Sequence, residues 1–404
     1  MQEKALAGIK VLDLSRVLAG PYCSMLLGDY GADIVKVEAP QRGDDTRHWG
    51  PPWAGGESAY FLSVNRNKRS LTLDLKNPKG QALLHSLAME ADILLENFRV
   101  GTTQKWGIDY TSLQTKHPGI IYCSVSGYGQ NGPNAKKAGY DFAIQAQGGI
   151  MSISGPPEQQ EGSKVGVAIV DITAGLFASN AILAALQHRN RTGEGQYIDV
   201  ALFDAQLAWL ANVAQNHLVS GDIPGRYGNA HPNIVPYQTF MAKDRAFALA
   251  VGNDRQYQNL CQVADCMELW DEPKYQTNAG RVEHRAELVA LLGEIFAKKT
   301  VVEWLELLES VGIPCAPINN VAQAFEEPQV EARDMLQEIS HPTAGMVRLV
   351  GPVAKLSKTP AEISAPPPLL GQHNAAILSD WLGLSEEDLQ KLQDEGAFGE
   401  VESS

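Results

Sequence analysis

The feature that most restricts the fold of this chain is the alternation of strands and helices in its first half. Residues 9–14 form an apolar run typical of a buried strand, Gly20-Pro21 begins a helix, and residues 33–38 predict the next strand. Strand, helix and strand fit within roughly thirty residues, the size of one βαβ unit. Because the alternation continues, we expect an α/β fold with a mostly parallel sheet covered on both faces. Further strands are predicted at 71–75, 92–96, 119–126 and 197–200, and further helices at 78–89, 173–187 and 203–219.

The composition of the chain changes after residue 220. Residues 221–236 are rich in Gly, Pro and Asn and predict a loop, and two apolar runs around a turn at 243–245 predict a hairpin. Helical patterns follow at 285–298 and 301–311. The predicted segments are the N-terminal part of a large domain at 1–200, a linker helix and loop at 201–225, a small α+β domain at 226–325 and a return segment at 326–404.

The charge of the chain argues against two classes of partner. Lys and Arg number 33 and Asp and Glu number 47, which gives a net charge of −14. Such a surface repels nucleic acid and anionic lipid, so we expect neither nucleic acid nor a membrane as a partner. Five cysteines without a C-x-x-C pair argue against disulfides and zinc knuckles. The first apolar run is short and contains Asp13, and the stretch 174–186 is too short to span a bilayer, so we expect a cytoplasmic protein.

Catalytic motifs are few. GYGQNG at 127–132 matches G-x-G-x-x-G, but Pro133 follows where a helix should begin, so a glycine-rich turn near a ligand is favoured over a dinucleotide site. The sequence has no G-x-S-x-G, H-E-x-x-H or P-loop motif, and its nine histidines lack metal-ligand spacing. We therefore expect no metal site.

Two sets of polar residues have both a structural and a functional interpretation. Asp171 ends an apolar run before a predicted helix, where an aspartate is either the helix N-cap or a carboxylate nucleophile. Basic residues gather at 65–69 and near later strand ends, where they either form solvated surface or bind phosphates at the carboxyl edge of the sheet. The later ones are Lys76, Arg99, Lys105, Lys136 and Lys137.

Taken together, motifs that follow one another from residue 8 to residue 373 resemble those of class III CoA-transferases, the family of formyl-CoA transferase and carnitine CoA-transferase. Two segments, HPNIVPY at 231–237 and APPPLLGQH at 365–373, most resemble the succinyl-CoA-dependent transferases of glutarate or hydroxymethylglutarate. The other motifs are LDLSRVLAGP at 12–21, GADIVKVE at 31–38, GDDTR at 43–47, NRNKRS at 65–70, ENF at 96–98, SGYGQNGP at 126–133, GYD at 139–141, the segment around Asp171 and TGEGQ at 192–196.

The resemblance implies a fold and an activity. The fold is a Rossmann-like large domain whose parallel sheet is built from both chain ends, with a smaller α+β domain, in an interlocked homodimer. The activity is transfer of CoA from an acyl-CoA, for this subgroup succinyl-CoA, to a free carboxylic acid such as a dicarboxylate. Acyl-CoA and small carboxylic acids are then the substrates, and no permanently bound cofactor is expected.

The resemblance also implies roles for individual residues. The nucleophile of the family falls on Asp171, which attacks the thioester to form a mixed anhydride and then an aspartyl-CoA thioester. With the pKa of an aspartate in water, about 3.9, this side chain is charged at neutral pH. The CoA contacts fall on Val17, Ala19, Arg42, Leu73, Lys76, Asn97, Phe98, Lys105 and Tyr140. The candidates for holding the oxyanion or covering the anhydride are Leu18, Ala19, Gly20, Gly228 and Asn229.

Two other functions stay open from the sequence. Related acyl-CoA racemases carry His where this chain has Tyr140, and a tyrosine is a poor base at neutral pH, which favours transfer over racemisation. In the third hypothesis the chain only binds acyl-CoA and Asp171 caps its helix. A second substrate carboxylate requires a cation or strong donors, although Arg47 has the alternative of an ion pair with Asp44 or Asp45. The candidates for binding that carboxylate are Arg16, Arg47, Tyr60 and His231.

Overall fold

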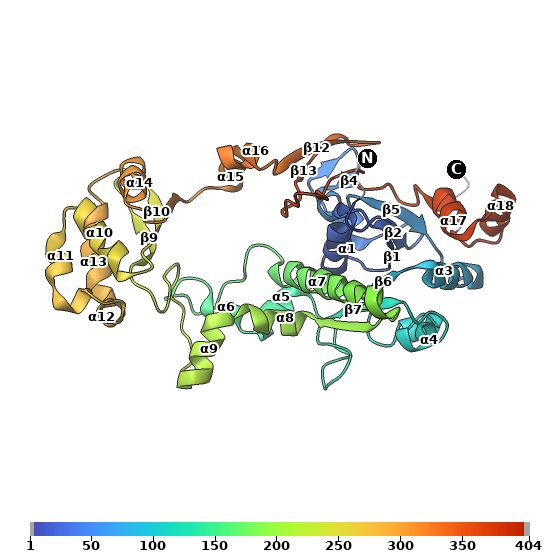
Figure 1. The fold of residues 1–404 in the computed structure, drawn as a ribbon, viewed down its shortest axis with the longest axis horizontal. Helices are drawn as coiled ribbons and strands as arrows, with labels where there is room; N and C mark the ends of the chain where they lie inside the picture. Colours follow the sequence, from blue (N-terminus) through green and yellow to red (C-terminus); the bar gives the residue numbers. More distant parts are fainter. Residues whose placement is uncertain (1–3, 400–404) are drawn as a thin grey trace. The chain divides into compact units, whose positions relative to one another are not determined.

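Six parallel strands form the sheet at the centre of the first of two units in the computed structural model, which describes residues 4–399 (Figure 1). The first unit comprises residues 4–149, 165–215 and 328–399, and the second comprises 150–164 and 216–327. The units divide the chain at other residues than the predicted segments do, because 150–164 belong to the second unit and 201–215 to the first. The strands of the sheet are β1 (Lys10–Asp13), β2 (Asp33–Glu38), β5 (Lys68–Thr72), β6 (Ile93–Glu96), β7 (Ile121–Ser126) and β8 (Tyr197–Ala201).

The order of the strands across the sheet is β5-β2-β1-β6-β7-β8, and every neighbouring pair is parallel. Numbered along the chain, the six strands have the doubly wound order 3-2-1-4-5-6. β1 pairs with β2 on one side, Lys10 opposite Asp33, and with β6 on the other, Val11 opposite Ile93. The predicted α/β fold with a parallel sheet is confirmed. The winding reverses between β1 and β6, where such sheets bind ligands at the carboxyl ends of their strands.

The expectation that both ends of the chain supply strands to this sheet is wrong. All six strands lie between residues 10 and 201, and residues 364–374 instead bond to the edge strand β5 and to Asn67 beside it. His373 N–H donates to Ser70 O at 3.0 Å, and Ser70 N–H donates to His373 Nδ1 at 3.2 Å. Thr72 N–H donates to Asn374 Oδ1 at 2.9 Å. An edge strand needs partners for its backbone polar groups, and the C-terminal segment supplies them through one backbone N–H and two side chains without forming a strand.

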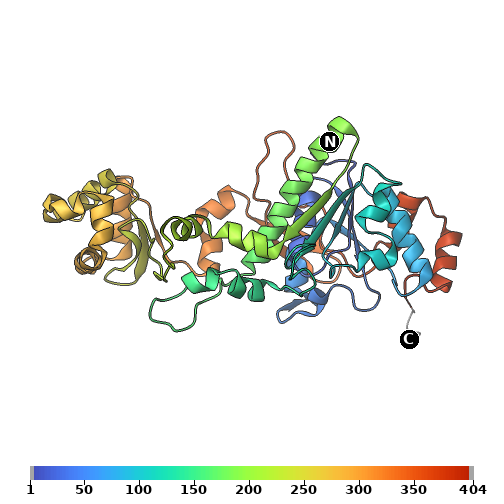
Figure 2. The ribbon, with the colours of Figure 1, turned by 90° about the horizontal axis from the view of Figure 1, so that it is seen from below.

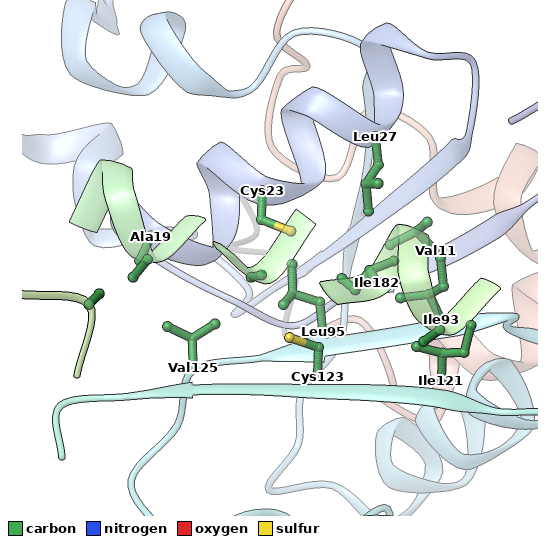
Figure 3. Close-up of a cluster of buried hydrophobic side chains, with 14 of the residues drawn as sticks. Val11, Ala19, Cys23, Leu27, Ile93, Leu95, Ile121, Cys123, Val125 and Ile182 are labelled. Atoms are coloured by element: carbon green, nitrogen blue, oxygen red, sulfur yellow. The ribbon is translucent and has the colours of Figure 1, made fainter. Parts of the chain in front are cut away.

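Helices cover both faces of the sheet, with α7 on one side and α3, α17 and α18 on the other (Figure 2). On the first face, α1 (Ala19–Asp29) and α7 (Ile169–Thr192) form a core with the sheet that includes Val11, Leu27 and Ile182 (Figure 3). The small residues Ala174 and Ala178 allow α7 to lie close to its neighbours. The helices of the opposite face are α3 (Pro78–Glu90), α4 (Tyr110–Gln114), α17 (Asn374–Leu382) and α18 (Glu386–Asp394).

Two predicted elements differ in extent from the structure. The helix predicted at 203–219 is interrupted, because Ala211 has a φ of 42° and a right-handed helix cannot continue through it. The strand predicted at 71–75 is β5 at 68–72, whose buried polar residues Lys68 and Ser70 do not read as core from the sequence. The other elements of the first unit are η1 (Asp45–His48), β3 (Trp53–Ala54), β4 (Glu57–Ser58), α2 (Ala59–Val64), η2 (Thr103–Trp106), α5 (Asp141–Gln147), α8 (Leu202–Trp209), α16 (Pro328–Ala332), β12 (Leu336–His341) and β13 (Gly345–Val350), and α9 (Ala211–Ser220) contains the boundary between the units.

The second unit has its own core on a three-stranded antiparallel sheet in the order β11-β10-β9. Phe240, Phe247 and Trp304 each pack against Phe296, with ring centroids 4.8, 5.2 and 5.0 Å apart. The elements of this unit are α6 (Ile150–Ile153), β9 (Tyr237–Met241), β10 (Ala246–Ala250), α10 (Asp254–Val263), α11 (Met267–Asp271), η3 (Pro273–Tyr275), α12 (Asn278–Glu283), α13 (Arg285–Phe296), α14 (Val301–Ser310), β11 (Cys315–Pro317) and α15 (Val321–Glu326).

By length and composition alone, α7 is the one helix among residues 4–399 that could cross a membrane. It is longer than the sequence predicts because it begins at Ile169 and continues to Thr192. The core helix of a soluble protein meets the same criteria, and α7 packs on the sheet and α1. Its exposed apolar side chains are Leu176, Phe177 and Leu183.

Candidate active site

A cavity of about 160 Å³ lies at the point of the sheet where the winding reverses. Its walls come from the loops after β1, β6 and β7 and from the starts of α1 and α7. Asn97 joins the first two loops, because its Oδ1 accepts from Arg16 N–H at 2.9 Å and its Nδ2 donates to Arg16 O at 2.7 Å. The lining includes Arg16, Val17, Leu18, Ala19, Asn97, Phe98, Arg99, Gly127, Lys136, Lys137, Gly139, Tyr140 and Asp171.

Asp171 lies in the first turn of α7 and lines this cavity. The helix begins at Ile169, and its N-cap residue Ala168 provides no side-chain cap. Asp141 supplies the cap instead, because its Oδ1 accepts from Val170 N–H at 2.8 Å and from Asp171 N–H at 3.4 Å. The interpretation of Asp171 as the cap of its own helix is therefore wrong.

The surroundings of Asp171 keep its carboxyl group partly protonated at neutral pH. The residue is 9% exposed, and burial, reinforced by the charge of Asp141, raises the pKa of Asp171 to about 7. The expectation that this side chain is charged at neutral pH used the pKa of an aspartate in water, and burial moves the pKa of Asp171 above that value. Burial also limits the access of bulk water to the carboxylate oxygens.

The start of α1 faces the same cavity as Asp171. Leu18 is the N-cap residue of α1 and provides no side-chain cap. Leu18 and Ala19 line the cavity, whereas Gly20 does not. The N–H groups in the first turn of a helix have no acceptor within the helix, so this turn presents partial positive charge to the cavity. That is the property an oxyanion site requires, and the role of these residues stays a prediction.

Gly175 sets the approach of α7 to α1 beside the cavity. It lies one turn after Asp171, and a Cβ on Gly175 would be 2.6 Å from Ala19 O. Real Cβ atoms do not come so close to a backbone oxygen, so a glycine is required for the two helix starts to meet. The crossing places the nucleophile candidate next to the first turn of α1.

Most residues predicted to contact CoA lie along two adjoining cavities. Val17, Ala19, Asn97 and Tyr140 line the cavity of Asp171. A second cavity, of about 440 Å³, shares Arg16 and Phe98 with it. Arg42, Leu73 and Lys76 line the second cavity. Lys105 is exposed in η2 and lines neither of the two.

Arg47, predicted to bind a substrate carboxylate, is bonded to carboxylates of the protein itself. It is 8% exposed, its Nε and Nη2 donate to Glu38 at 2.8 Å each, and Nη1 donates to Glu57 at 3.4 Å. Nη2 also donates to Pro368 O at 3.1 Å. The donors of this guanidinium are used within the protein, and its partners are not the predicted Asp44 or Asp45.

The other carboxylate candidates lie in different surroundings. Arg16 is exposed between the two cavities and approaches Asp45 at 3.5 Å. Tyr60 is half-buried, and burial followed by the charges of nearby carboxylates, Asp171 first among them, raises its pKa to about 12. His231, Gly228 and Asn229 belong to the second unit and stay predictions.

The basic side chains of the run at 65–69 contact other parts of the protein, which favours a structural role for them over phosphate binding. Arg66 pairs with Asp29 at 2.7 Å and Arg69 pairs with Asp33 at 2.6 Å. Lys68 is fully buried, where its Nζ donates to Pro21 O at 2.8 Å. The basic side chains that line the cavity of Asp171 are Arg16, Arg99, Lys136 and Lys137.

Reasoning from the sequence missed the functions of two carboxylates. Asp141 stands in the quoted GYD motif, but nothing local shows that it caps a helix that begins 28 residues later. Glu96 accepts from Phe98 N–H at 2.8 Å and from the Ser124 hydroxyl, so it shapes the loop that forms one cavity wall. Burial raises the pKa of Glu96 to about 7. The only sequence signal for Glu96 is its position as a polar residue at the end of the apolar strand β6.

Residues 4–399 contain no group of three or more His, Cys, Asp or Glu side chains arranged to hold a metal ion.

The chain belongs to CoA-transferase family III, whose model matches residues 6–374, and it is accordingly a class III CoA-transferase. Succinyl-CoA:glutarate CoA-transferase of Homo sapiens is 43% identical to it over 400 residues, which cover 99% of this chain and 91% of that protein. Succinate–glutarate CoA-transferase of Agrobacterium fabrum is 44% identical, covering 93% of this chain and 95% of that protein. The crystal structure of a CAIB/BAIF family protein from Brucella suis matches with a TM-score of 0.82 at 44% identity, covering 94% of this chain and 100% of that chain.

Proposed function

We propose that this enzyme transfers CoA from succinyl-CoA to a dicarboxylate such as glutarate or hydroxymethylglutarate through covalent intermediates on Asp171. The observation that carries the proposal is the position of Asp171, buried at the carboxyl edge of the sheet and beside the uncapped first turn of α1. The substrates named for the human and Agrobacterium relatives support succinyl-CoA as donor and glutarate as acceptor.

The chemistry needs no proton transfer. An Asp171 oxygen attacks the thioester carbon of succinyl-CoA, the C–S bond breaks, and CoA leaves as a thiolate, which gives a mixed anhydride. The thiolate then attacks the aspartyl carbonyl and expels succinate, which gives an aspartyl-CoA thioester. An acceptor carboxylate attacks that thioester and releases the thiolate again, and the thiolate takes the acyl group of the acceptor and frees Asp171. The first turn of α1 would stabilise the oxyanion in each step.

Mass spectrometry tests this function. After mixing with succinyl-CoA, we expect a CoA adduct on the peptide that contains Asp171, and loss of the adduct when glutarate is added. Scrambling of a chiral acyl-CoA without any acceptor would instead support the racemase hypothesis. CoA binding with neither reaction would support a binding protein, although Asp171 does not cap its helix as that hypothesis assumed. A panel of succinate, glutarate, hydroxymethylglutarate, itaconate, malate and carnitine identifies the preferred acceptor.

We also propose the homodimer that the resemblance implies, with interlocked chains. Exposed apolar side chains of α7 support it, since large apolar patches on a surface mark sites of association. Leu176, Phe177 and Leu183 line a cavity of about 760 Å³ with residues of α1 and the segment 352–354. Light scattering of the purified protein gives the mass, and a monomer at micromolar concentration would contradict the proposal. The cytoplasmic location stays a prediction.

The rate of CoA exchange should rise with pH through about 7, because only the ionised form of Asp171 attacks. Asp141→Asn removes the neighbouring charge but keeps an oxygen that can cap α7, so the pKa of Asp171 falls. We expect the acid limb of kcat/KM to move by about one pH unit to lower pH in this variant. Measuring kcat/KM of both enzymes between pH 5.5 and 8.5 tests this expectation. If the acid limb did not move, a group other than Asp171 would set the pH dependence.

Lys76→Ala should weaken CoA binding by about three- to tenfold, and more at low salt, because Lys76 lines the second cavity and can meet a phosphate there. Lys79→Ala is the matched control, since Lys79 pairs with Glu395 at 2.9 Å and does not line that cavity. Isothermal titration with CoA at two salt concentrations measures both variants. Equal losses in the two would place the phosphates of CoA elsewhere.

A further inference from the structure

Val17, between β1 and α1, has a backbone conformation that its side chain disfavours. Its φ is 69°, in the left-handed region, where a β-branched residue is a genuine outlier. The other residues with positive φ that are not glycine are Gln41, Asn67, Ala211, Asp265 and Asp334, so Val17 is the only β-branched member within residues 4–399. Such strain persists only where surrounding contacts impose it, and it gathers at functional sites.

Asp44 is the contact that holds this backbone. Val17 N–H lies 3.2 Å from both Oδ1 and Oδ2 of Asp44. Thr46 fixes Oδ1 through its N–H at 3.0 Å and its hydroxyl at 2.9 Å, and Lys36 Nζ fixes Oδ2 at 2.8 Å. Asp44 is 3% exposed, so water does not compete for these bonds.

Lys36 binds the turn a second time, since its Nζ also donates to Ser15 O at 2.8 Å. Burial alone would raise the pKa of Asp44, but the charge of Lys36 and the hydrogen bonds from Lys36 and Thr46 outweigh it and hold that pKa at about 2. Asp44 is therefore a charged acceptor at neutral pH. One buried ion pair, Lys36 with Asp44, thus binds the backbone at both Ser15 and Val17.

The direction of α1 depends on this turn. Leu18 follows Val17 and is the uncapped N-cap of α1, and Leu18 and Ala19 line the cavity of Asp171. If Val17 relaxed to a negative φ, the first turn of α1 would point elsewhere. We infer that Asp44 is a positioning residue, which holds Val17 in its left-handed conformation and so fixes the first turn of α1 opposite Asp171. This inference rests on the proposed covalent function of Asp171.

A double-mutant cycle with glycine tests the inference. Asp44→Ala removes the acceptor, and we expect kcat of exchange to fall by on the order of a hundredfold while KM for glutarate changes by less than about threefold. Glycine adopts positive φ without strain, so Val17→Gly in the Asp44→Ala background should recover on the order of tenfold in kcat. Val17→Gly alone is the reference for the cycle, because Val17 also lines the cavity.

Ala211→Gly is the matched control. Ala211 also has positive φ, at 42°, but lies at the junction of α8 and α9. Adding it to Asp44→Ala should leave kcat low. Equal recovery from both glycines would reduce the role of Asp44 to general stability, and no recovery from Val17→Gly would overturn the inference.

A second substitution at residue 44 keeps the test valid if Asp44→Ala fails to fold. Asp44→Ala removes the direct ion-pair partner of the buried Lys36 and also its hydrogen-bond acceptor, whereas Asp44→Asn keeps one acceptor oxygen. Asp44→Asn is therefore run in the same cycle with a smaller expected loss. Melting curves and CoA titration confirm that each variant is folded. The adduct on Asp171 in the unaltered enzyme tests the proposed function separately. Its absence defeats that function, whereas its presence without coupling between residues 17 and 44 defeats only the inference about Asp44.

Discussion

Asp171→Asn should lower the rate of CoA exchange by at least about 10⁴-fold, since loss of a covalent nucleophile is among the most damaging changes an active site can undergo. An amide neither forms the anhydride nor carries CoA, so the adduct on the peptide around residue 171 should vanish. CoA should still bind, because the residues of the second cavity are unaltered. Exchange that persists at more than a hundredth of the normal rate would exclude Asp171 as the nucleophile.

The melting temperature of Asp171→Asn gives a second test, because the direction of its change with pH follows from the pKa of Asp171. The pKa of Asp171 is about 7 in the folded chain and about 3.9 when unfolded, so the folded state holds its proton more tightly. Its favourable contribution is complete below about pH 4 and is lost as the pH rises through 7. Asparagine does not ionise, so at pH 8 Asp171→Asn should melt roughly 5 °C higher than the unaltered enzyme, and the difference should vanish near pH 4. A variant that melts lower at pH 8 would contradict the raised pKa of the buried Asp171.

Gly175→Ala should have the second largest effect. Its Cβ would lie 2.6 Å from Ala19 O, and because that oxygen belongs to the backbone, α1 and α7 must separate. Displacing the first turn of α1 by even 1 Å should cost about a hundredfold in kcat, and overpacking should cost about 1–3 kcal/mol of folding free energy. Initial rates and melting curves measure both effects.

Gly293→Ala is the matched control for that substitution. Gly293 also lies within a helix, α13, but a Cβ there would meet nothing within 4 Å. This variant should keep full activity and gain about 0.5–1 kcal/mol of stability, because alanine favours the helix. If Gly175→Ala behaved in the same way, the close crossing of α1 and α7 would not matter for catalysis.

The strands and helices that depend on the pattern of neighbouring residues could be predicted from the sequence. Apolar runs and a proline at a helix start predict β1, α1 and β2 nearly to the residue, because buried parallel strands are apolar on both faces. Their order along the chain also predicts that ligands bind at the carboxyl edge of the sheet. The structure adds that the loops after β1 and β6 meet there.

What could not be predicted depends on residues far apart in the chain. Asp141 caps the helix of Asp171 from another element, and only the folded chain shows that this leaves the Asp171 carboxyl group to the cavity. From the sequence, Arg47 is a candidate ligand for a substrate carboxylate, and only the folded chain shows that it bonds to Glu38 and Pro368. The pKa of Asp171 likewise depends on burial and on a neighbouring charge, and neither is visible in its own segment.

The pairing of the edge strand β5 with the C-terminal segment has a consequence for the synthesis of the protein. The backbone N–H of Ser70 can bond to its partner His373 only after another 303 residues have been synthesised, and that of Thr72 likewise requires Asn374. A nascent chain emerging from the ribosome therefore carries an open sheet margin until nearly all of it has been synthesised, and contacts between such distant positions form slowly. During that interval the exposed margin can pair with another unfinished chain, so early termination before residue 373 should yield insoluble product rather than a smaller working enzyme.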